Sequence, residues 1–148
     1  MIEIRRGVKQ DVPVVLELIK ELADYEKSPD QVATTVESME RDGFGDHPLY
    51  GFYVAEHDDT VIGVALYYYR YSTWKGKRLY LEDLVVTESA RGTGAGKLLF
   101  DQMIAHGKSN NCTGMMWQVL DWNESAIDFY KKYDATLDEE WLNGHLDW

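Results

Sequence analysis

The segment Leu84-Val85-Val86-Thr87-Glu88-Ser89-Ala90-Arg91-Gly92-Thr93-Gly94-Ala95-Gly96-Lys97 joins a strand-like apolar run to a glycine-rich turn. The run ends at Val86, and a helix is expected to begin at about Gly94. Glycines let a backbone approach a phosphate closely, and the first N–H groups of a helix lack intrahelical partners. The helix dipole adds positive charge there, as do Arg91 and Lys97. The segment therefore predicts an anion-binding turn.

The spacing of the turn excludes two common phosphate motifs. A P-loop needs four residues between its first glycine and Gly-Lys-Ser/Thr, and here Leu98 follows Lys97. The dinucleotide pattern G-x-G-x-x-G does not fit, because Gly92, Gly94 and Gly96 alternate. Taken alone, the segment is equally compatible with an ordinary tight turn, so its surroundings decide.

Periodicity before the turn predicts two helices and several strands. Asp11 is expected to cap a helix that presents one apolar face through about Glu26. Thr34 and Glu37 resemble a capping box for a shorter helix ending near Asp42-Gly43. The expected strands are Ile2–Arg5, Phe52–Glu56, Val61–Tyr71 and Leu79–Val86, with a hairpin turn at His57-Asp58-Asp59-Thr60.

The pattern after the turn predicts two more helices and two more strands. The first helix runs from about Gly94 to His106, and a strand follows over Met115–Leu120. Asn123 or Ser125 can cap the second helix, which reaches about Tyr133. A final strand is expected over Trp141–Trp148. This order mixes hairpins with crossover units, which is typical of an α+β fold with a mixed central β-sheet flanked by helices. We expect one domain over residues 1–148.

Composition limits the classes of partner. The chain has 15 Lys and Arg against 26 Asp and Glu, a formal net charge of −11. Nucleic-acid binding depends on cationic side chains, so this balance argues against a nucleic-acid partner. It is compatible with steering a cationic small molecule to an acidic cleft, although acidity also simply aids solubility.

The sequence also argues against a metal site, a disulfide and a membrane segment. Cys112 is the only cysteine, and the four histidines show no metal-ligand spacing. No apolar run approaches the ~20 residues that a membrane span requires. The segment Met1–Arg6 lacks the apolar stretch of a secretory signal. We therefore expect a soluble, cytoplasmic protein without a metal cofactor.

Two carboxylates lie inside an otherwise apolar strand, at Glu82 and Asp83. Buried charges are costly unless they are paired or solvated in a cleft, and strand alternation places these two on opposite faces. One of them could accept a proton from an ammonium substrate and attract it. An internal salt bridge with Lys77 or Arg78 is the equally supported alternative.

Two further features have both a structural and a functional interpretation. Tyr130 follows Phe129 on an expected helix; it could be a packing residue or a proton donor, since a phenol stays protonated at neutral pH. The tyrosines of Tyr67–Tyr71 and Trp74 more often belong to a core or sheet surface. They could also line a slot for a cationic alkyl chain through cation–π contacts.

The pattern Arg-x-x-Gly-x-Gly directly after a strand resembles the acyl-CoA-binding motif of the GNAT superfamily of N-acetyltransferases, and the expected element order matches that fold. The segment Asn123–Tyr130 resembles its N-x-x-A-x-x-x-Y motif. The resemblance implies that the turn binds the pyrophosphate of coenzyme A and that the preceding strand pairs with the pantetheine arm. The implied cofactor residues are Leu84, Val85, Val86, Arg91, Gly92, Thr93, Gly94, Ala95, Gly96, Lys97, Asn123, Ser125, Ala126 and Tyr130.

Three other segments, Ile19–Glu26, Asp42–Pro48 and Tyr80–Leu84, look like the diamine acetyltransferase family, which contains spermidine/spermine and thialysine acetyltransferases. The resemblance implies Tyr130 as general acid and Glu82 near the amine. It implies a homodimer as well. The implied substrate residues are Tyr25, Glu26, Glu82, Asp83, Trp117, Gln118 and Glu140.

The chain departs from that family's pattern at two positions. Polyamine-preferring members carry aspartate where this chain has Ser72, and Leu120–Asn123 looks more like the thialysine-type members. Asp134 stands where the family usually has glycine. The resemblance thus implies acetyl transfer from acetyl-CoA to a primary amine of a small cationic substrate. Acetylation of protein or peptide lysines, and a non-catalytic coenzyme-A-binding role, are the alternatives.

Overall fold

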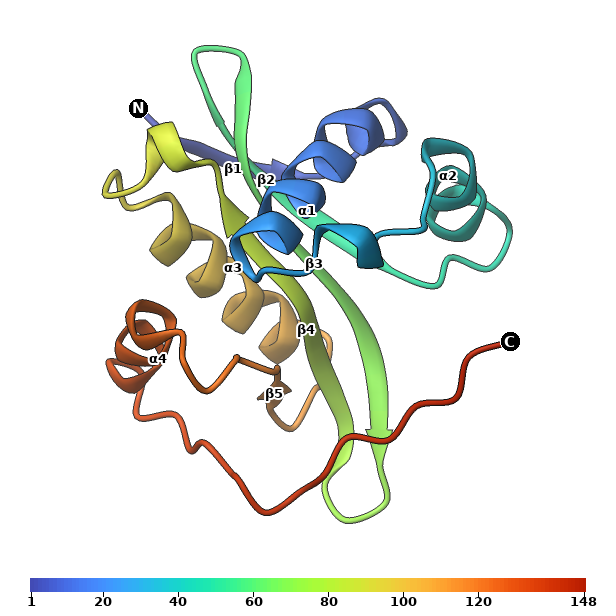
Figure 1. The fold of residues 1–148 in the computed structure, drawn as a ribbon, viewed down its shortest axis with the longest axis vertical. Coiled ribbons are helices and arrows are strands. Elements are labelled where there is room, and N and C mark those ends of the chain that lie inside the picture. Colours follow the sequence, from blue (N-terminus) through green and yellow to red (C-terminus); the bar gives the residue numbers. More distant parts are fainter. The chain divides into compact units, whose positions relative to one another are not determined.

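Five strands in the order β1-β2-β3-β4-β5 form the sheet of the first of two units of the chain (Figure 1). The computed structural model describes residues 1–148, and it divides into Met1–Trp117 and Gln118–Trp148. Neighbouring strands from β1 to β4 are antiparallel, and β5 runs parallel to β4. The mixed sheet confirms the predicted α+β fold. The strands are β1 (Glu3–Arg6), β2 (Gly51–His57), β3 (Thr60–Ser72), β4 (Gly76–Val86) and β5 (Met115–Met116).

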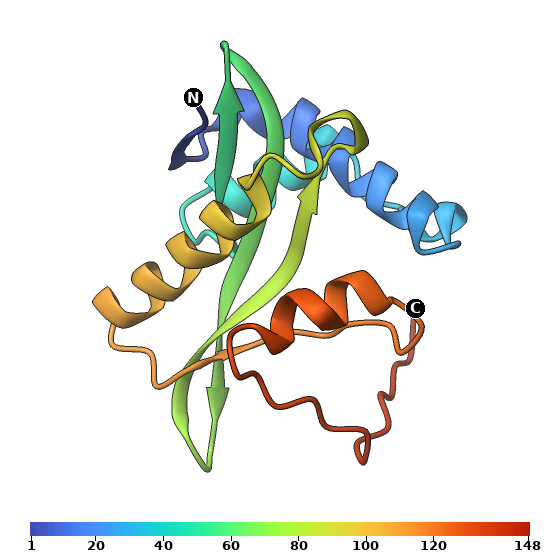
Figure 2. The same ribbon diagram turned by 90° about the vertical axis from the view of Figure 1, so that its left-hand side faces the viewer.

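Helices cover both faces of this sheet. Helices α1 (Val12–Tyr25) and α2 (Val36–Phe44) lie on one face, and α3 (Ala95–Ser109) lies on the other (Figure 2). Alternation along β2 explains the division, because Phe52 and Val54 join the core under α1 whereas Tyr53 bonds to His106 of α3. No helix in the chain is both long and apolar enough to span a bilayer.

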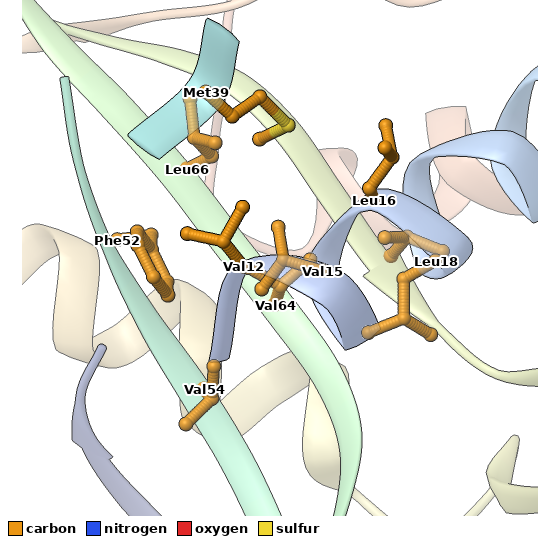
Figure 3. Close-up of a cluster of buried hydrophobic side chains, with 10 residues drawn as sticks. Val12, Val15, Leu16, Leu18, Met39, Phe52, Val54, Val64 and Leu66 are labelled. Atoms are coloured by element: carbon orange, nitrogen blue, oxygen red, sulfur yellow. The ribbon is translucent and has the colours of Figure 1, made fainter. Parts of the chain in front are cut away.

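The main core lies between α1 and the sheet (Figure 3). The apolar residues of α1 recur at helical spacing, as predicted, and Val12 and Val15 are fully buried against Val54 and Val64. Each fully buried aliphatic side chain of this kind contributes roughly 1.5–3 kcal/mol. Met39 of α2 closes the cluster at its edge. This packing determines which residues of α1 can reach the loops at the end of β4.

Two of the predicted helix caps, those of α1 and α2, differ from the prediction. Asp11 directly precedes α1, but its carboxylate does not cap that helix. It accepts hydrogen bonds from the Val8 amide at 2.8 Å and from the Arg5 guanidinium at 2.8 and 2.9 Å, and so ties β1 to the start of α1. The capping box of α2 uses Thr35 and Ser38, one residue beyond the predicted Thr34 and Glu37.

The predicted hairpin between β2 and β3 is confirmed. Asp58 and Asp59 form its turn with φ angles of 50° and 61°. Two successive left-handed residues are typical of the type I′ turn, whose twist matches that of the flanking strands. Aspartate tolerates this conformation better than most residues, because its short polar side chain bonds locally.

The second unit contains α4 (Glu124–Lys131), capped by Asn123, whose Oδ1 accepts from the Ala126 amide at 3.3 Å. Past the end of α4, Asp134 has φ = 57°, which explains why glycine is suited to this position. The strand predicted over Trp141–Trp148 is wrong: these residues form no strand, and their large apolar side chains are exposed. No neighbouring strand pairs with their backbone. The strand predicted over Met115–Leu120 is likewise limited to Met115–Met116.

Candidate active site

The glycine-rich turn has the backbone geometry of an anion site. Gly92 and Gly94 have φ angles of 80° and 90°, in the left-handed region that favours glycine. Helix α3 begins at Ala95, and no side chain caps it. A Cβ atom built at either glycine would meet no heavy atom within 4 Å, so the outer side of the turn is open. The N–H groups of the first turn of α3 are thus available to a ligand.

The two cations of the turn have different surroundings. The Arg91 guanidinium carbon lies 5.1 Å from the centroid of the Tyr25 ring at the end of α1, and Arg91 makes no salt bridge. Lys97 pairs with Asp101 one turn further along α3, with 2.7 Å between Nζ and Oδ2. Arg91 therefore contributes the larger net positive charge at the opening of the turn. The cation–π contact also places Tyr25 beside the predicted cofactor turn.

Glu21 of α1 anchors the loop that precedes the turn, a role that sequence reasoning missed. Its carboxylate accepts a hydrogen bond from the Glu88 amide at 2.8 Å and from the Thr87 hydroxyl at 3.0 Å. A further hydrogen bond lies within the loop and the turn, where the Thr93 hydroxyl donates to the Ala90 carbonyl at 2.6 Å. The partners of Glu21 are 66 and 67 residues away in sequence, so no local pattern marks it.

The Glu21→Gln variant should loosen this loop. Bonds to a carboxylate are stronger than bonds to a neutral amide, and one amide oxygen replaces two carboxylate oxygens. We expect backbone amides over residues 86–94 to exchange hydrogen about tenfold faster, as measured by mass spectrometry. Glu17→Gln, an exposed position on the same helix, is the matched control. Equal exchange rates in the two variants would contradict the anchoring role.

Strand β4 is bulged at Glu82, close to the point where its pairing with β5 ends. Leu66 of β3 pairs with Asp83, and the next residue, Tyr67, pairs with Leu81, so Glu82 has no partner of its own. Strict alternation along the strand was the basis for expecting Glu82 and Asp83 on opposite faces, and the bulge interrupts that alternation. The ladder with β5 contains only Leu79 and Tyr80 of β4. The stretch Leu84-Val85-Val86 therefore pairs with β3 but with no strand on its other side.

Three of the predicted substrate-side carboxylates interact at this bulge. Burial, with smaller contributions from the charges of Glu82 and Glu26, raises the pKa of Asp83 to about 7. Burial also raises the pKa of Glu26. The salt bridge proposed with Lys77 or Arg78 does not form. Lys77 instead donates to the Asn110 carbonyl and Arg78 to the Thr113 hydroxyl. The charges that act on Asp83 are those of Glu82 and Glu26, both carboxylates.

The raised pKa of Asp83 makes a prediction about stability. Between about pH 4 and 7 the folded protein keeps a proton on Asp83 that the unfolded chain has lost, so this group makes stability fall as pH rises. Asp83→Asn removes the titration. We expect its melting temperature, relative to wild type, to rise progressively from pH 4 to pH 8. Asp30→Asn, at an exposed position, controls for the loss of one negative charge. A difference that is constant across this range would contradict the assignment.

The aromatic residues of β3 do not form one slot. Tyr67 and Tyr69 surround His106 under α3, whereas Tyr68 stacks on Tyr80 with 5.1 Å between ring centroids. The remaining two, Tyr71 and Trp74, are exposed at the β3–β4 hairpin. Ser72 is part of that hairpin turn, because its hydroxyl accepts from the amides of Trp74 and Lys75.

The predicted residues of the second unit lie on and around α4. Asn123, Ser125 and Ala126 form its first turn, and the buried Tyr130 packs edge-on against Phe129 with 5.4 Å between ring centroids. Gln118 donates to the Asn143 side chain at 2.9 Å. Glu140 lies in the exposed C-terminal segment, and Trp117, the last residue of the first unit, packs edge-on against Phe100 of α3.

Comparison with known proteins identifies the class of this molecule. Residues 15–134 match the acetyltransferase (GNAT) family, and the chain belongs to that family. It is 40% identical to the thialysine N-epsilon-acetyltransferase of Bos taurus over 149 residues, covering 93% of this chain and 88% of that protein. The Mus musculus protein of the same name is 35% identical over 95% and 89% of the two chains.

A solved structure shares the fold over almost the whole chain. An aminoglycoside acetyltransferase from an uncultured soil metagenomic sample superposes with a TM-score of 0.80 at 18% identity, covering 99% of this chain and 96% of that one. The predicted GNAT fold is confirmed. The family match and the curated relatives together show that this protein is an N-acetyltransferase enzyme. The structure holds no group of three or more His, Cys, Asp or Glu side chains placed to bind a metal ion.

Proposed function

We propose that this enzyme transfers the acetyl group of acetyl-CoA to a primary amine of a small cationic substrate, either a thialysine- or lysine-like amine or a diamine. The observation that carries the proposal is the grouping of Glu26, Glu82 and Asp83 at the β4 bulge. Three carboxylates attract an ammonium group. The thialysine acetyltransferases among the relatives support this substrate class.

The residues of the first unit fit coenzyme A as a ligand. The left-handed glycines and the uncapped start of α3 suit the pyrophosphate, and Arg91 adds a charge to the same place. The one-sided pairing of Leu84-Val85-Val86 leaves backbone groups on β4 for the amide groups of the pantetheine arm. We assign the whole turn from Arg91 to Lys97 to pyrophosphate binding.

The carboxylates of the bulge prepare the amine for attack. A protonated amine is not a nucleophile, so one proton must leave it before the nitrogen can attack the thioester carbonyl. A carboxyl with a pKa of about 7 accepts a proton effectively at neutral pH, and Asp83 meets this requirement. Glu82 is exposed beside Asp83. It holds the ammonium and relays the released proton through water. At the end of α1, Glu26 interacts with Asp83, and the neighbouring Tyr25 contacts Arg91 of the turn.

Tyr130 is assigned to the leaving group. When the amine nitrogen bonds to the carbonyl carbon, the carbon–sulfur bond breaks and the sulfur leaves as a thiolate that needs a proton. A phenol can donate that proton, and the second proton that the nitrogen loses as it becomes an amide restores the phenol. Asn123, Ser125 and Ala126 at the start of α4 are assigned to the pantetheine arm. Trp117, Gln118 and Glu140 are assigned to the substrate side. The family match over residues 15–134 includes residues of both units.

A substrate panel tests the proposed reaction. Release of free thiol from acetyl-CoA should be measured with thialysine, lysine, putrescine, spermidine and a lysine-containing peptide. Because Ser72 replaces the aspartate of polyamine-preferring members, we expect thialysine and lysine to exceed spermidine in kcat/KM. Activity on the peptide alone would favour a protein lysine acetyltransferase. Thermal protection by acetyl-CoA without turnover of any amine would favour a non-catalytic coenzyme-A-binding protein.

Size-exclusion chromatography would test the proposed homodimer.

Tyr130→Phe tests the proton donor. The substitution removes only the hydroxyl, so we expect kcat to fall by about 100-fold while the affinity for acetyl-CoA stays the same. Turnover is measured by thiol release and affinity by calorimetry. Tyr133→Phe, three residues along the same segment, is the matched control and should keep its activity. An unchanged kcat in Tyr130→Phe would remove this residue from the mechanism.

A further inference from the structure

His106 is a buried histidine that the proposed reaction does not use. It lies near the C-terminal end of α3 with 6% of its surface exposed. Its Nδ1 is 2.9 Å from the hydroxyl of Tyr53 on β2, and its Nε2 is 2.7 Å from the hydroxyl of Tyr69 on β3. The ring also packs against Tyr67, with 4.5 Å between centroids. One imidazole therefore links α3 to two strands of the sheet.

These two hydrogen bonds suit a neutral imidazole. A neutral ring has one N–H donor and one acceptor nitrogen, so one tyrosine donates to it and the other accepts from it. A protonated ring has two donors, and both tyrosines would then have to accept. The tyrosine proton that had bonded to the ring nitrogen would then have to turn to another acceptor, and water can reach Tyr69, 44% of whose surface is exposed.

The charges around the cluster also oppose protonation. Arg6 of β1 lies over the Tyr53 ring at 5.9 Å, and the Lys77 ammonium of β4 lies 4.4 Å from the Tyr69 ring centroid. The other titratable groups facing the cluster are the tyrosines themselves and Cys112, which interacts with Tyr69. No Asp or Glu side chain contributes to the electrostatics of His106. Burial lowers the pKa of His106, and the charges of Arg6 and Lys77 lower it further.

We propose that His106, Tyr53 and Tyr69 form an acid-sensitive latch, in which protonation of His106 loosens the C-terminal half of α3 from β2 and β3. The new charge would lie buried between two cations without a counter-ion, which favours an opened helix end where water can solvate it. Between the lowered pKa of the folded state and the ordinary value of histidine, the unfolded chain binds more protons. The latch therefore loses stability as pH falls through this window.

His106→Gln tests the latch, because a glutamine amide can both donate and accept but does not titrate. Between pH 7.5 and 5.0 we expect the melting temperature of wild type to fall by at least about 3 °C more than that of the variant. His47→Gln, which alters an exposed histidine, should follow wild type. Amides over residues 100–109 should exchange faster at pH 5.0 in wild type, after correction for intrinsic rates, but not in His106→Gln. Parallel melting curves for wild type and His106→Gln would overturn the proposal.

A second measurement needs no variant that might fail to fold. Nuclear magnetic resonance of the imidazole signals in wild type follows each of the four histidines through the same pH range. We expect His106 to protonate below the ordinary range of histidine, with a simultaneous change in the amide signals of α3. Protonation of His106 within or above that ordinary range would overturn the latch. Neither experiment depends on acetyl-CoA, so the result is independent of the proposed reaction.

Discussion

The packing of α1 on the sheet is the interaction on which the rest of the structure depends. The buried face of the helix, led by Val12 and Val15, locks its position against Val54 and Val64. On its other side and at its end, the same helix presents Glu21 to the loop after β4, Tyr25 to Arg91 and Glu26 to Asp83. One helical turn corresponds to 5.4 Å along the axis, so a shift of one turn would break all three contacts. The apolar core thus aligns three contacts that are separate from one another.

The proposed cofactor site explains how an acidic chain would hold an anionic ligand. The positive end of the site consists largely of backbone N–H groups and Arg91, and it does not need a basic surface. The carboxylates gather at the bulge, several residues earlier along β4. In the proposed reaction, an amine attracted to the bulge of β4 and an anion held at the turn after β4 are thereby kept at separate points. Net charge alone, at −11, describes neither site.

The sequence predicted the features that local chemistry determines. The glycine turn, the helices and the β2–β3 hairpin follow from periodicity and from residues that tolerate left-handed backbone, such as Gly94 and Asp59. The features that it missed depend on distant partners. Glu21 carries no local mark of its role, and the bulge at Glu82 exists only in relation to β3. A strand over Trp141–Trp148 would require a neighbour whose backbone pairs with it, and no strand does so.

Helix α3 is held at its two ends by different chemistry. Before its N-terminus, the carboxylate of Glu21 accepts hydrogen bonds from the loop. Near its C-terminus, His106 bonds to Tyr53 and Tyr69, and the proposed latch holds only while the imidazole is neutral. The proposed acid-sensitive contact thus belongs to the C-terminal end. Because the glycine turn lies at the other end of the helix, about 17 Å of helix separates it from His106 at 1.5 Å per residue. The geometry thus separates the acid-sensitive contact from the cofactor turn within a single helix.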